Sequence, residues 1–198
     1  TAGQILINDN HVTINNPKEA RSYGIGMVFQ HFTLFPALTV SENILISLDE
    51  KITKKHLEDK ISITAKQWGL PIEPTKKVFD LSVGEQQRVE IIRCLLQNPK
   101  LLIMDEPTSV LSPQEINQLF KVLRKLANSG CSILYISHKL NEIKQIASKV
   151  TILRSGKVIS STDTSKISTT SMAEKMIGKK VKKITKNKLK IVLISITY

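Results

Sequence analysis

The segment Leu101-Leu102-Ile103-Met104-Asp105-Glu106 decides the fold of this 198-residue chain. Its four consecutive apolar residues predict a strand buried on both faces, as in parallel sheets. Two carboxylates follow where the strand ends, and ligands of open α/β sheets bind at that edge. Asp105 is a candidate ligand for Mg²⁺, which prefers hard oxygen donors, and Glu106 a candidate to orient or deprotonate a water that attacks a phosphate. The alternative is a strand that simply ends in two solvated acids.

Strand and helix patterns alternate on both sides of this segment. We expect strands at residues 5–7, 11–14, 25–30, 101–104 and 132–136, helices at 54–68, 113–128 and 140–149, a hairpin at 150–160, and a last helix opened by a capping box at Ser171 and Glu174. The strand at 132–136, like that at 101–104, is expected to be buried. This order predicts an α/β domain with a mostly parallel sheet, and the stretch of about 40–98 predicts a helical subdomain beside it.

A second candidate site lies at the start of a helix, in Leu81-Ser82-Val83-Gly84-Glu85-Gln86-Gln87-Arg88. Ser82 and Glu85 have the spacing of a capping box, so a plain helix start is the alternative. A helix N-terminus also binds anions through its free N–H groups. Ser82 adds a hydroxyl, and Gly84 lacks a side chain where a backbone would approach a ligand closely.

Two further polar residues follow predicted strands. His138 comes after the strand at 132–136, beside the carboxylate strand, so its imidazole is a candidate to reach a γ-phosphate. Gln30 closes the strand at 25–30 and is a candidate to contact the metal or the attacking water. A structural histidine and an exposed polar strand end are the alternatives.

Together, in this order, these segments resemble the ATP-binding cassette (ABC) ATPases over roughly residues 1–178. The resemblance makes Gln30 the Q-loop glutamine, residues 81–86 the signature sequence, residues 101–106 the Walker B strand and His138 the switch histidine. It implies ATP and Mg²⁺ as cofactors, with Glu106, His138 and Gln30 catalytic and with Asp105 and Gln30 near the metal. In two halves that face head to tail, Ser82, Val83, Gly84, Glu85 and Gln86 would contact the ATP of the opposing half.

The segments at 24–44, 81–91 and 138–142 are similar to those of ATPases of simple-sugar and nucleoside importers. The commoner family signature has Gly and Gln at the positions of Val83 and Glu85, and most members have Asp where Ser112 stands. The resemblance implies an ATPase subunit at the cytoplasmic face of the membrane, with transmembrane permease subunits as partners and a substrate-binding protein as an indirect one. A coupling helix of the permease would dock near residues 30–43.

The phosphate-binding motif G-x-x-x-x-G-K-[ST] does not occur in the sequence. The family places it just upstream of Thr1, so we expect a chain that is incomplete at its N-terminus, lacks the N-terminal strand or strands, and is inactive alone. Residues 179–198 are expected to form a Lys-rich linker and the opening of a second ATPase half.

Composition bounds the remaining alternatives. Seven of the 29 basic residues lie between Lys179 and Lys190, so the net charge of +12 is largely a local run, typical of a solvated linker. We do not expect a nucleic-acid partner, although a non-catalytic regulatory or nucleic-acid-associated cassette protein is the rival interpretation. Cys94 and Cys131 lack metal-ligand spacing and are predicted to be buried thiols. No apolar run is long enough to span a bilayer.

Overall fold

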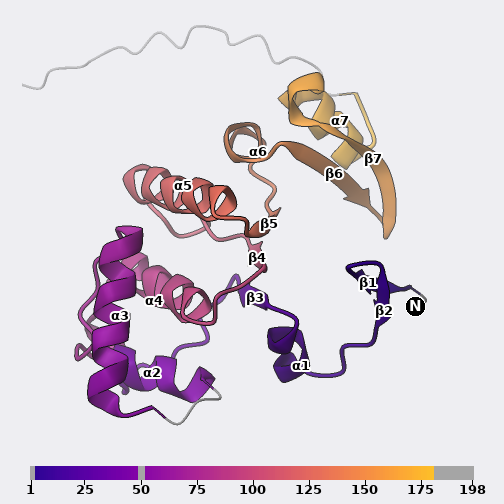
Figure 1. Cartoon of the computed structure of the whole chain (residues 1–198). Helices are drawn as coiled ribbons and strands as arrows, with labels where there is room; N and C mark the ends of the chain where they lie inside the picture. Colours follow the sequence, from indigo (N-terminus) through magenta and orange to yellow (C-terminus); the bar gives the residue numbers. More distant parts are fainter. Residues whose placement is uncertain (1–2, 49–51, 181–198) are drawn as a thin grey trace, which may run out of the picture. The chain divides into compact units, whose positions relative to one another are not determined.

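A computed structural model describes residues 3–48 and 52–180 of the chain (Figure 1). The chain divides into two compact units, Thr1–His138 and Lys139–Tyr198. The predicted second-half opening and nearly all of the predicted linker fall in 181–198, outside the described residues. Both candidate sites lie in the first unit.

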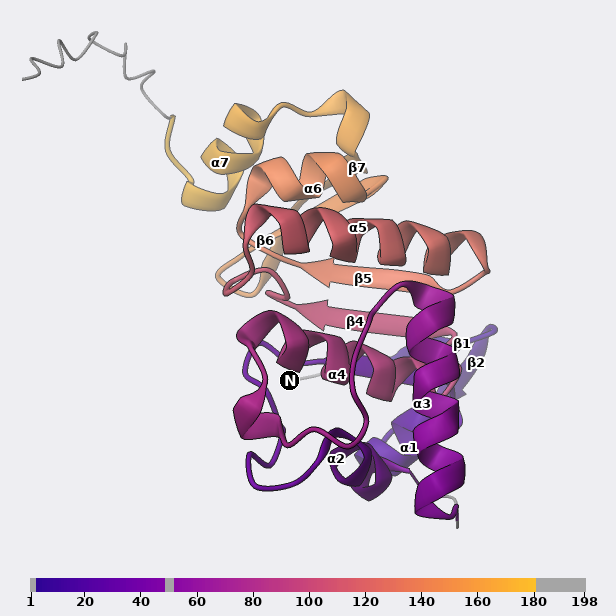
Figure 2. The same ribbon diagram turned by 90° about the vertical axis from the view of Figure 1, so that its left-hand side faces the viewer.

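Three parallel strands form the sheet of the first unit, in the order β3 (Ile25–Val28), β4 (Leu101–Asp105) and β5 (Ser132–Ile136). Met104 pairs with Val28 on one side and with Tyr135 on the other. Figure 2 shows β4 and β5 side by side, with α5 (Pro113–Asn128) running along them. The predicted α/β class is confirmed.

The predictions that the strand at 101–104 is buried on both faces and that the strand at 132–136 is buried are wrong. Burial alternates along β4, where Leu102 and Met104 are fully buried and their neighbours are only partly covered. On β5, Leu134 is 51% and Ile136 43% exposed. The apolar runs therefore predicted the positions of the strands correctly but not the burial of their side chains, because neighbouring elements decide how much of each face is buried.

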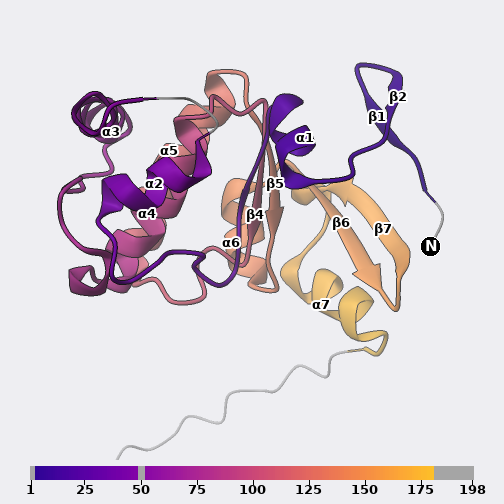
Figure 3. The ribbon, with the colours of Figure 1, turned by 90° about the horizontal axis from the view of Figure 1, so that it is seen from below.

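Four helical elements occupy the region predicted as a helical subdomain: α2 (Val40–Ser47), α3 (Lys54–Trp68), the 3₁₀ turn η1 (Val78–Asp80) and α4 (Val83–Leu95). Figure 3 shows α2, α3 and α4 gathered on one side of β4 and β5. Apolar residues of α3 and α4, among them Leu57, Ile61, Val89 and Ile92, are fully buried. These residues, which recur at helical spacing, therefore form the core of this region.

Local signals fix the helix ends. The α3 bounds agree with the prediction, because Thr53 caps its start and Gly69 ends it in the left-handed conformation with φ +67°. Ser112 and Glu115 form the capping box that opens α5, with Pro113 at its first position. One short helix, α1 (Pro17–Ser22), was not predicted, although Asn16 caps it before a proline.

Two antiparallel hairpins complete the described chain. In the first unit, β1 (Ile5–Ile7) pairs with β2 (Asn10–Val12). In the second unit, β6 (Lys149–Arg154) pairs with β7 (Lys157–Asp163), and α7 (Thr169–Ile177) packs against both strands. Helix α6 (Leu140–Ile146) packs with α7 and with the 3₁₀ turn η2 (Thr164–Lys166).

Two predictions for the second unit need correction. Helix α6 ends at Ile146 rather than Lys149, because Ala147 is already extended and Lys149 begins β6. The cap of α7 is Ser168, whose hydroxyl accepts the N–H of Ser171, so Ser171 lies within the helix and does not open it. Serines three residues apart offer two registers to the capping rule, and packing selects the earlier one.

Candidate functional site

The sheet edge at the end of β4 brings Glu106 and His138 into direct contact. Glu106 Oε1 accepts the backbone N–H of His138 at 3.0 Å and lies 2.7 Å from His138 Nδ1. The Glu106 side chain is 15% exposed, whereas that of His138 is 70% exposed. One edge of the histidine is therefore held by the carboxylate, while the rest of the ring faces outward.

The backbone of Glu106 is in an uncommon conformation. Its φ is +46°, in the left-handed region that non-glycine residues rarely adopt. Its N–H donates to Ile136 O at 3.0 Å, which keeps the residue attached to β5. Strained residues persist where the surrounding structure holds them, and they cluster at functional sites.

The second carboxylate oxygen of Glu106, Oε2, is buried and accepts no hydrogen bond from the described residues. A buried oxygen without a partner costs free energy, so each such atom in a native structure calls for an explanation. A water or metal-bound water that arrives with the substrate would provide the missing hydrogen bond. Glu106 thus has one oxygen held by His138 and one buried oxygen without a hydrogen-bond partner among the described residues.

Gln30 and Asp105 lie at the same edge of the sheet. The register pairs Val28 with Met104, and Gln30 follows Val28 by two residues, as Glu106 follows Met104. Asp105 pairs with Ile136 on the other side of β4 and is partly exposed, whereas Gln30 is exposed. All four residues predicted for this edge therefore lie at or just after the carboxyl ends of neighbouring strands.

Oxygen donors at this edge fit a hard cation. No cluster of three or more His, Cys, Asp or Glu side chains with metal-binding geometry occurs among residues 3–48 and 52–180. Mg²⁺ keeps several waters and takes only one or two carboxylates together with substrate phosphates, so a dedicated cage is not needed. Asp105 and Gln30, the two predicted metal ligands, fit that donor set.

The second predicted site is the capped start of α4, and the predicted capping box is confirmed. Glu85 N–H donates to the Ser82 hydroxyl at 3.3 Å, and Ser82 N–H donates to the Glu85 carboxylate at 2.8 Å. This backbone hydrogen bond lowers the pKa of Glu85. Ser82 and Val83 are exposed, whereas Gln86 is half-buried and donates to Leu81 O at 3.2 Å. A phosphate would meet Ser82 first.

Gly84 is buried, and the close approach that it permits is to Glu115 of α5. A Cβ at this position would lie 1.6 Å from Glu115 Oε1. The other oxygen of Glu115 accepts the N–H of Ser112 at 2.9 Å and its hydroxyl at 2.7 Å. The missing side chain therefore lets the starts of α4 and α5 pack together, a role that the sequence pattern did not reveal.

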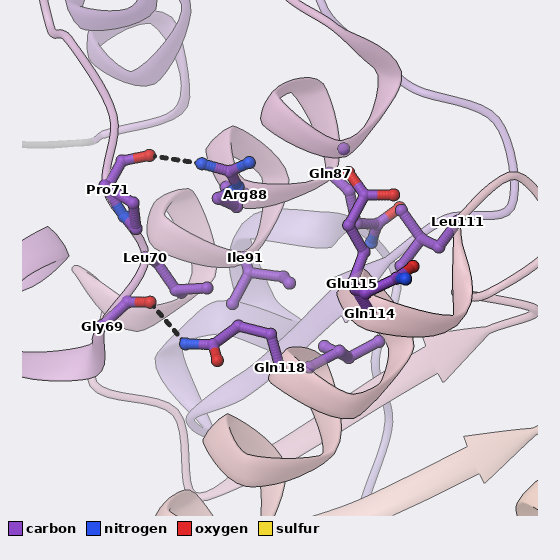
Figure 4. A pocket seen from close by; sticks show the side chains of 12 residues that line it. Gly69, Leu70, Pro71, Gln87, Arg88, Ile91, Leu111, Gln114, Glu115 and Gln118 are labelled. Atoms are coloured by element: carbon purple, nitrogen blue, oxygen red, sulfur yellow. Dashed lines mark hydrogen bonds between the residues drawn. The ribbon is translucent and has the colours of Figure 1, made fainter.

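A cavity of about 440 Å³ lies beside this contact between α4 and α5 (Figure 4). The loop after α3 closes one side of it and is attached to both helices. Arg88 Nη1 donates to Pro71 O at 2.8 Å, and Gln118 Nε2 donates to Gly69 O at 2.8 Å. Buried Gln87 also lines the cavity, and its Nε2 has no hydrogen-bond partner among the described residues.

Sequence reasoning missed one polar group near the site. Glu90 of α4 is 1% exposed and accepts the N–H of Thr33, three residues after Gln30, at 2.8 Å. Its only sequence signal is a carboxylate within an otherwise apolar helix face, and the partner lies 57 residues away.

Comparison with known proteins identifies the family of this chain. Residues 1–109 match the family model described as "ABC transporter". The chain is 40% identical over 191 residues to a nucleoside import ATP-binding protein, NupA, of Lactococcus lactis, covering 92% of this chain and 37% of that protein. It is 39% identical over 186 residues to a galactose/methyl galactoside import ATP-binding protein, MglA, of Fusobacterium nucleatum, covering 90% and 36%. The chain thus spans a little over a third of the length of these relatives.

Solved structures show the same fold. The ATP-binding cassette MJ0796, in a dimeric post-hydrolysis state bound to ADP and Pi, superposes with a TM-score of 0.70 at 25% identity, covering 83% of this chain and 74% of that one. MJ1267, an ATP-binding cassette of an ABC transporter, gives 0.76 at 23% identity, covering 89% and 76%.

The α/β fold is that of ATP-binding cassettes, a class of P-loop NTPase domains. The chain belongs to the ABC transporter family.

Proposed function

We propose that this chain is part of the ATP-binding, ATP-hydrolysing subunit of an importer for simple sugars or nucleosides. Support for the substrate class comes from the relatives, which are import ATP-binding proteins for nucleosides, ribose, galactose and glucose. Transported substrate is bound by other subunits in such an assembly, so the chemistry of this chain concerns ATP.

The observation that carries the proposal is the Glu106–His138 pair. Glu106 is a carboxylate fixed at the end of a central strand, with one oxygen on the histidine and the other unpartnered. It would accept a proton from the water that attacks the γ-phosphate, while His138 holds the carboxylate in place and presents the open edge of its ring to the phosphate. Gln30 would orient the same water from the neighbouring strand.

Asp105 and Gln30 would hold Mg²⁺ together with the phosphates of ATP. When bound, the ion neutralises charge that develops on the phosphate oxygens. The neighbouring carboxylates of Asp105 and Glu106 would otherwise repel a triphosphate, because like charges in a partly buried site oppose each other.

The start of α4 would act on the nucleotide of an opposing half. Ser82 is exposed and is the N-cap of α4, so its hydroxyl and the free N–H groups of the first turn would be available to phosphate oxygens. Two halves arranged head to tail would then close on ATP, and closure would move the membrane subunits.

The surface next to Gln30 would receive the permease at the cytoplasmic face of the membrane. Phe35 is 56% and Phe79 60% exposed, and Phe79 N–H donates to Pro36 O at 3.0 Å, which places these aromatic residues on adjoining segments. Such an apolar surface suits a short amphipathic helix. No helix of the described residues is itself long and apolar enough to cross a membrane.

The test is Glu106→Gln in the complete subunit assembled with its partners. Glutamine keeps an oxygen for the N–H of His138 but cannot accept a proton. Turnover should fall by about two to four orders of magnitude, the range for loss of a general base, while ATP binding stays close to that of the parent. Phosphate release and nucleotide affinity are measured side by side.

Asp59→Asn is the matched control, because it removes the same charge from an exposed position on α3. Its turnover should equal that of the parent. Hydrolysis by Glu106→Gln within a few-fold of the parent would show that Glu106 is not the base.

A further inference from the structure

A buried polar network joins α4 to the segment after β3. Oε1 of Glu90 accepts the backbone N–H of Thr33 at 2.8 Å and the Thr33 hydroxyl at 3.1 Å. Its Oε2 accepts a hydrogen bond from Nη2 of Arg93, and the same nitrogen donates to the Thr33 hydroxyl at 2.8 Å. Glu90 is 1% exposed, so its carboxylate is bonded on both oxygens inside the protein.

Stability alone does not account for this network. Removing two charges from water costs much of what their attraction returns, and a well-packed apolar pair of similar size often stabilises a protein as well or better. The network instead has a specific target, the backbone of Thr33, which it fixes through a charge-assisted hydrogen bond.

The same face of α4 holds the chain on the other side of Gln30. Cys94 lies one turn after Glu90, and its Sγ donates to Met27 O in β3 at 3.4 Å. Met27 and Thr33 lie on either side of Gln30 in the chain. Their partners, Cys94 and Glu90, are four residues apart on one face of α4. A shift of α4 would therefore displace Gln30.

The opposite end of α4 is Ser82, eight residues before Glu90. At 1.5 Å per residue, about 12 Å of helix separate the two positions. A capped helix of this length transmits a displacement along its axis because its hydrogen bonds resist stretching. The start of α4 and Gln30, which would act on two different nucleotides, thus share one rigid connection.

We infer that Glu90 is a positioning residue, through which nucleotide contact at the start of α4 sets the position of Gln30. The inference rests on the proposed function, since it requires both parts of that site. Asn43 of α2 anchors the chain further along, where its side chain accepts Phe35 N–H at 2.7 Å and donates to Phe35 O at 3.0 Å. Between β3 and Phe35 the chain is thus attached to α4 at Thr33, and this link through Glu90 determines where Gln30 lies.

The test compares two variants of the complete subunit assembled with its membrane partners and supplied with Mg²⁺ and ATP. Glu90→Gln keeps an oxygen for the N–H of Thr33. The double variant Glu90→Leu/Arg93→Met removes that acceptor and leaves no buried guanidinium without a partner. Each is measured for kcat, for KM of ATP, and for hydrogen exchange of the amides of residues 30–35 with and without ATP.

The double variant should lose about tenfold or more in kcat with KM within about twofold, because misplacing a catalytic group by about 1 Å is costly while nucleotide binding is untouched. Exchange at residues 30–35 should no longer respond to ATP. Glu90→Gln should stay within about threefold of the parent and keep the exchange response.

A third variant guards against misfolding of the double variant. Thr33 is exposed, so Thr33→Val leaves the core intact while it deletes the hydroxyl that both Glu90 and Arg93 contact. It should lower kcat by about threefold without changing KM. The exposed Asp59→Asn serves again as the variant without effect.

An unchanged kcat or an unchanged ATP-dependent exchange response in a folded double variant would overturn the inference, and so would a normal kcat in Thr33→Val if the double variant does not fold. Failure of the proposed function is recognised by a different result, the turnover of Glu106→Gln, which is measured with Glu90 intact. If the parent hydrolyses ATP and Glu106→Gln does not, the proposed function stands. The Glu90 variants then test only the further inference.

Discussion

Ser82 combines two roles at one residue, the cap of α4 and the proposed contact to phosphate. Substitution separates them, because Asp is as good an N-cap as Ser while its charge repels phosphate. Ser82→Ala should cost about 1 kcal/mol of stability through loss of the cap. Ser82→Asp should keep the stability of the parent and abolish ATP-driven closure of two halves, while nucleotide binding by one half persists.

Urea unfolding and nucleotide-dependent association of the halves measure the two effects. If Ser82→Asp still associates on addition of ATP, the start of α4 is a folding cap and not a contact to the opposing nucleotide.

Cys94 gives a prediction about pH. Burial raises the pKa of its thiol to about 11. The unfolded chain releases this proton near pH 9, so the stability that Cys94 confers is fully present below about pH 9 and is lost as pH rises through about 11. The urea midpoint should therefore decline between pH 8 and pH 10.5 more steeply in the parent than in Cys94→Ala. Equal slopes in the two proteins would show that the thiol ionises normally.

Packing between elements is tested at Gly84. In the parent, Gly84→Ala forces Glu115 away from Ser112 and should cost about 1 kcal/mol, the value of a helix cap. In a Glu115→Ala background the space is open, and the same substitution should stabilise by up to about 1 kcal/mol, as Gly to Ala does within helices.

Denaturant unfolding of the four proteins in this cycle gives the coupling energy. A destabilisation by Gly84→Ala that is equal in both backgrounds would mean that something other than Glu115 limits the position. A reversal of sign would establish that α4 and α5 are packed through this missing side chain.

Elements also show how far local signals go. The bounds of α3, α5 and β5 follow directly from caps, prolines and apolar periodicity. The start of α7 was placed too late because two serines compete for the cap, and α1 was missed because six residues carry too little periodicity.

At the scale of the whole molecule, the question is which residues hold the triphosphate. The motif G-x-x-x-x-G-K-[ST] does not occur in these 198 residues, and its backbone N–H groups and lysine are what grip phosphates in this class of ATPase. We propose that a polypeptide of these residues alone shows no saturable ATP binding up to millimolar nucleotide and no hydrolysis above background.

Calorimetric titration with Mg²⁺ and ATP makes the measurement. The same polypeptide extended upstream by a segment that carries the motif should bind ATP, and that extended protein is the control. Saturable, Mg²⁺-dependent binding by the 198 residues would show that other residues hold the phosphates.

The sequence by itself determined the α/β class, the order of the strands and longer helices, and the positions of the four candidate residues at or near strand ends. These follow from signals within a few residues of each other: apolar runs, caps, and polar residues directly after strands. It also indicated the start of α4, because a capping box is a local pattern.

Only the tertiary structure decided which groups touch. The hydrogen bond between Glu106 and His138 spans 32 residues, and that between Thr33 and Glu90 spans 57. The contact that requires Gly84 to lack a side chain joins two helices. Register and packing bring such distant residues together, and no periodicity in the chain encodes which of them will meet. For the same reason, the sequence did not show how much of each strand is covered by neighbouring elements.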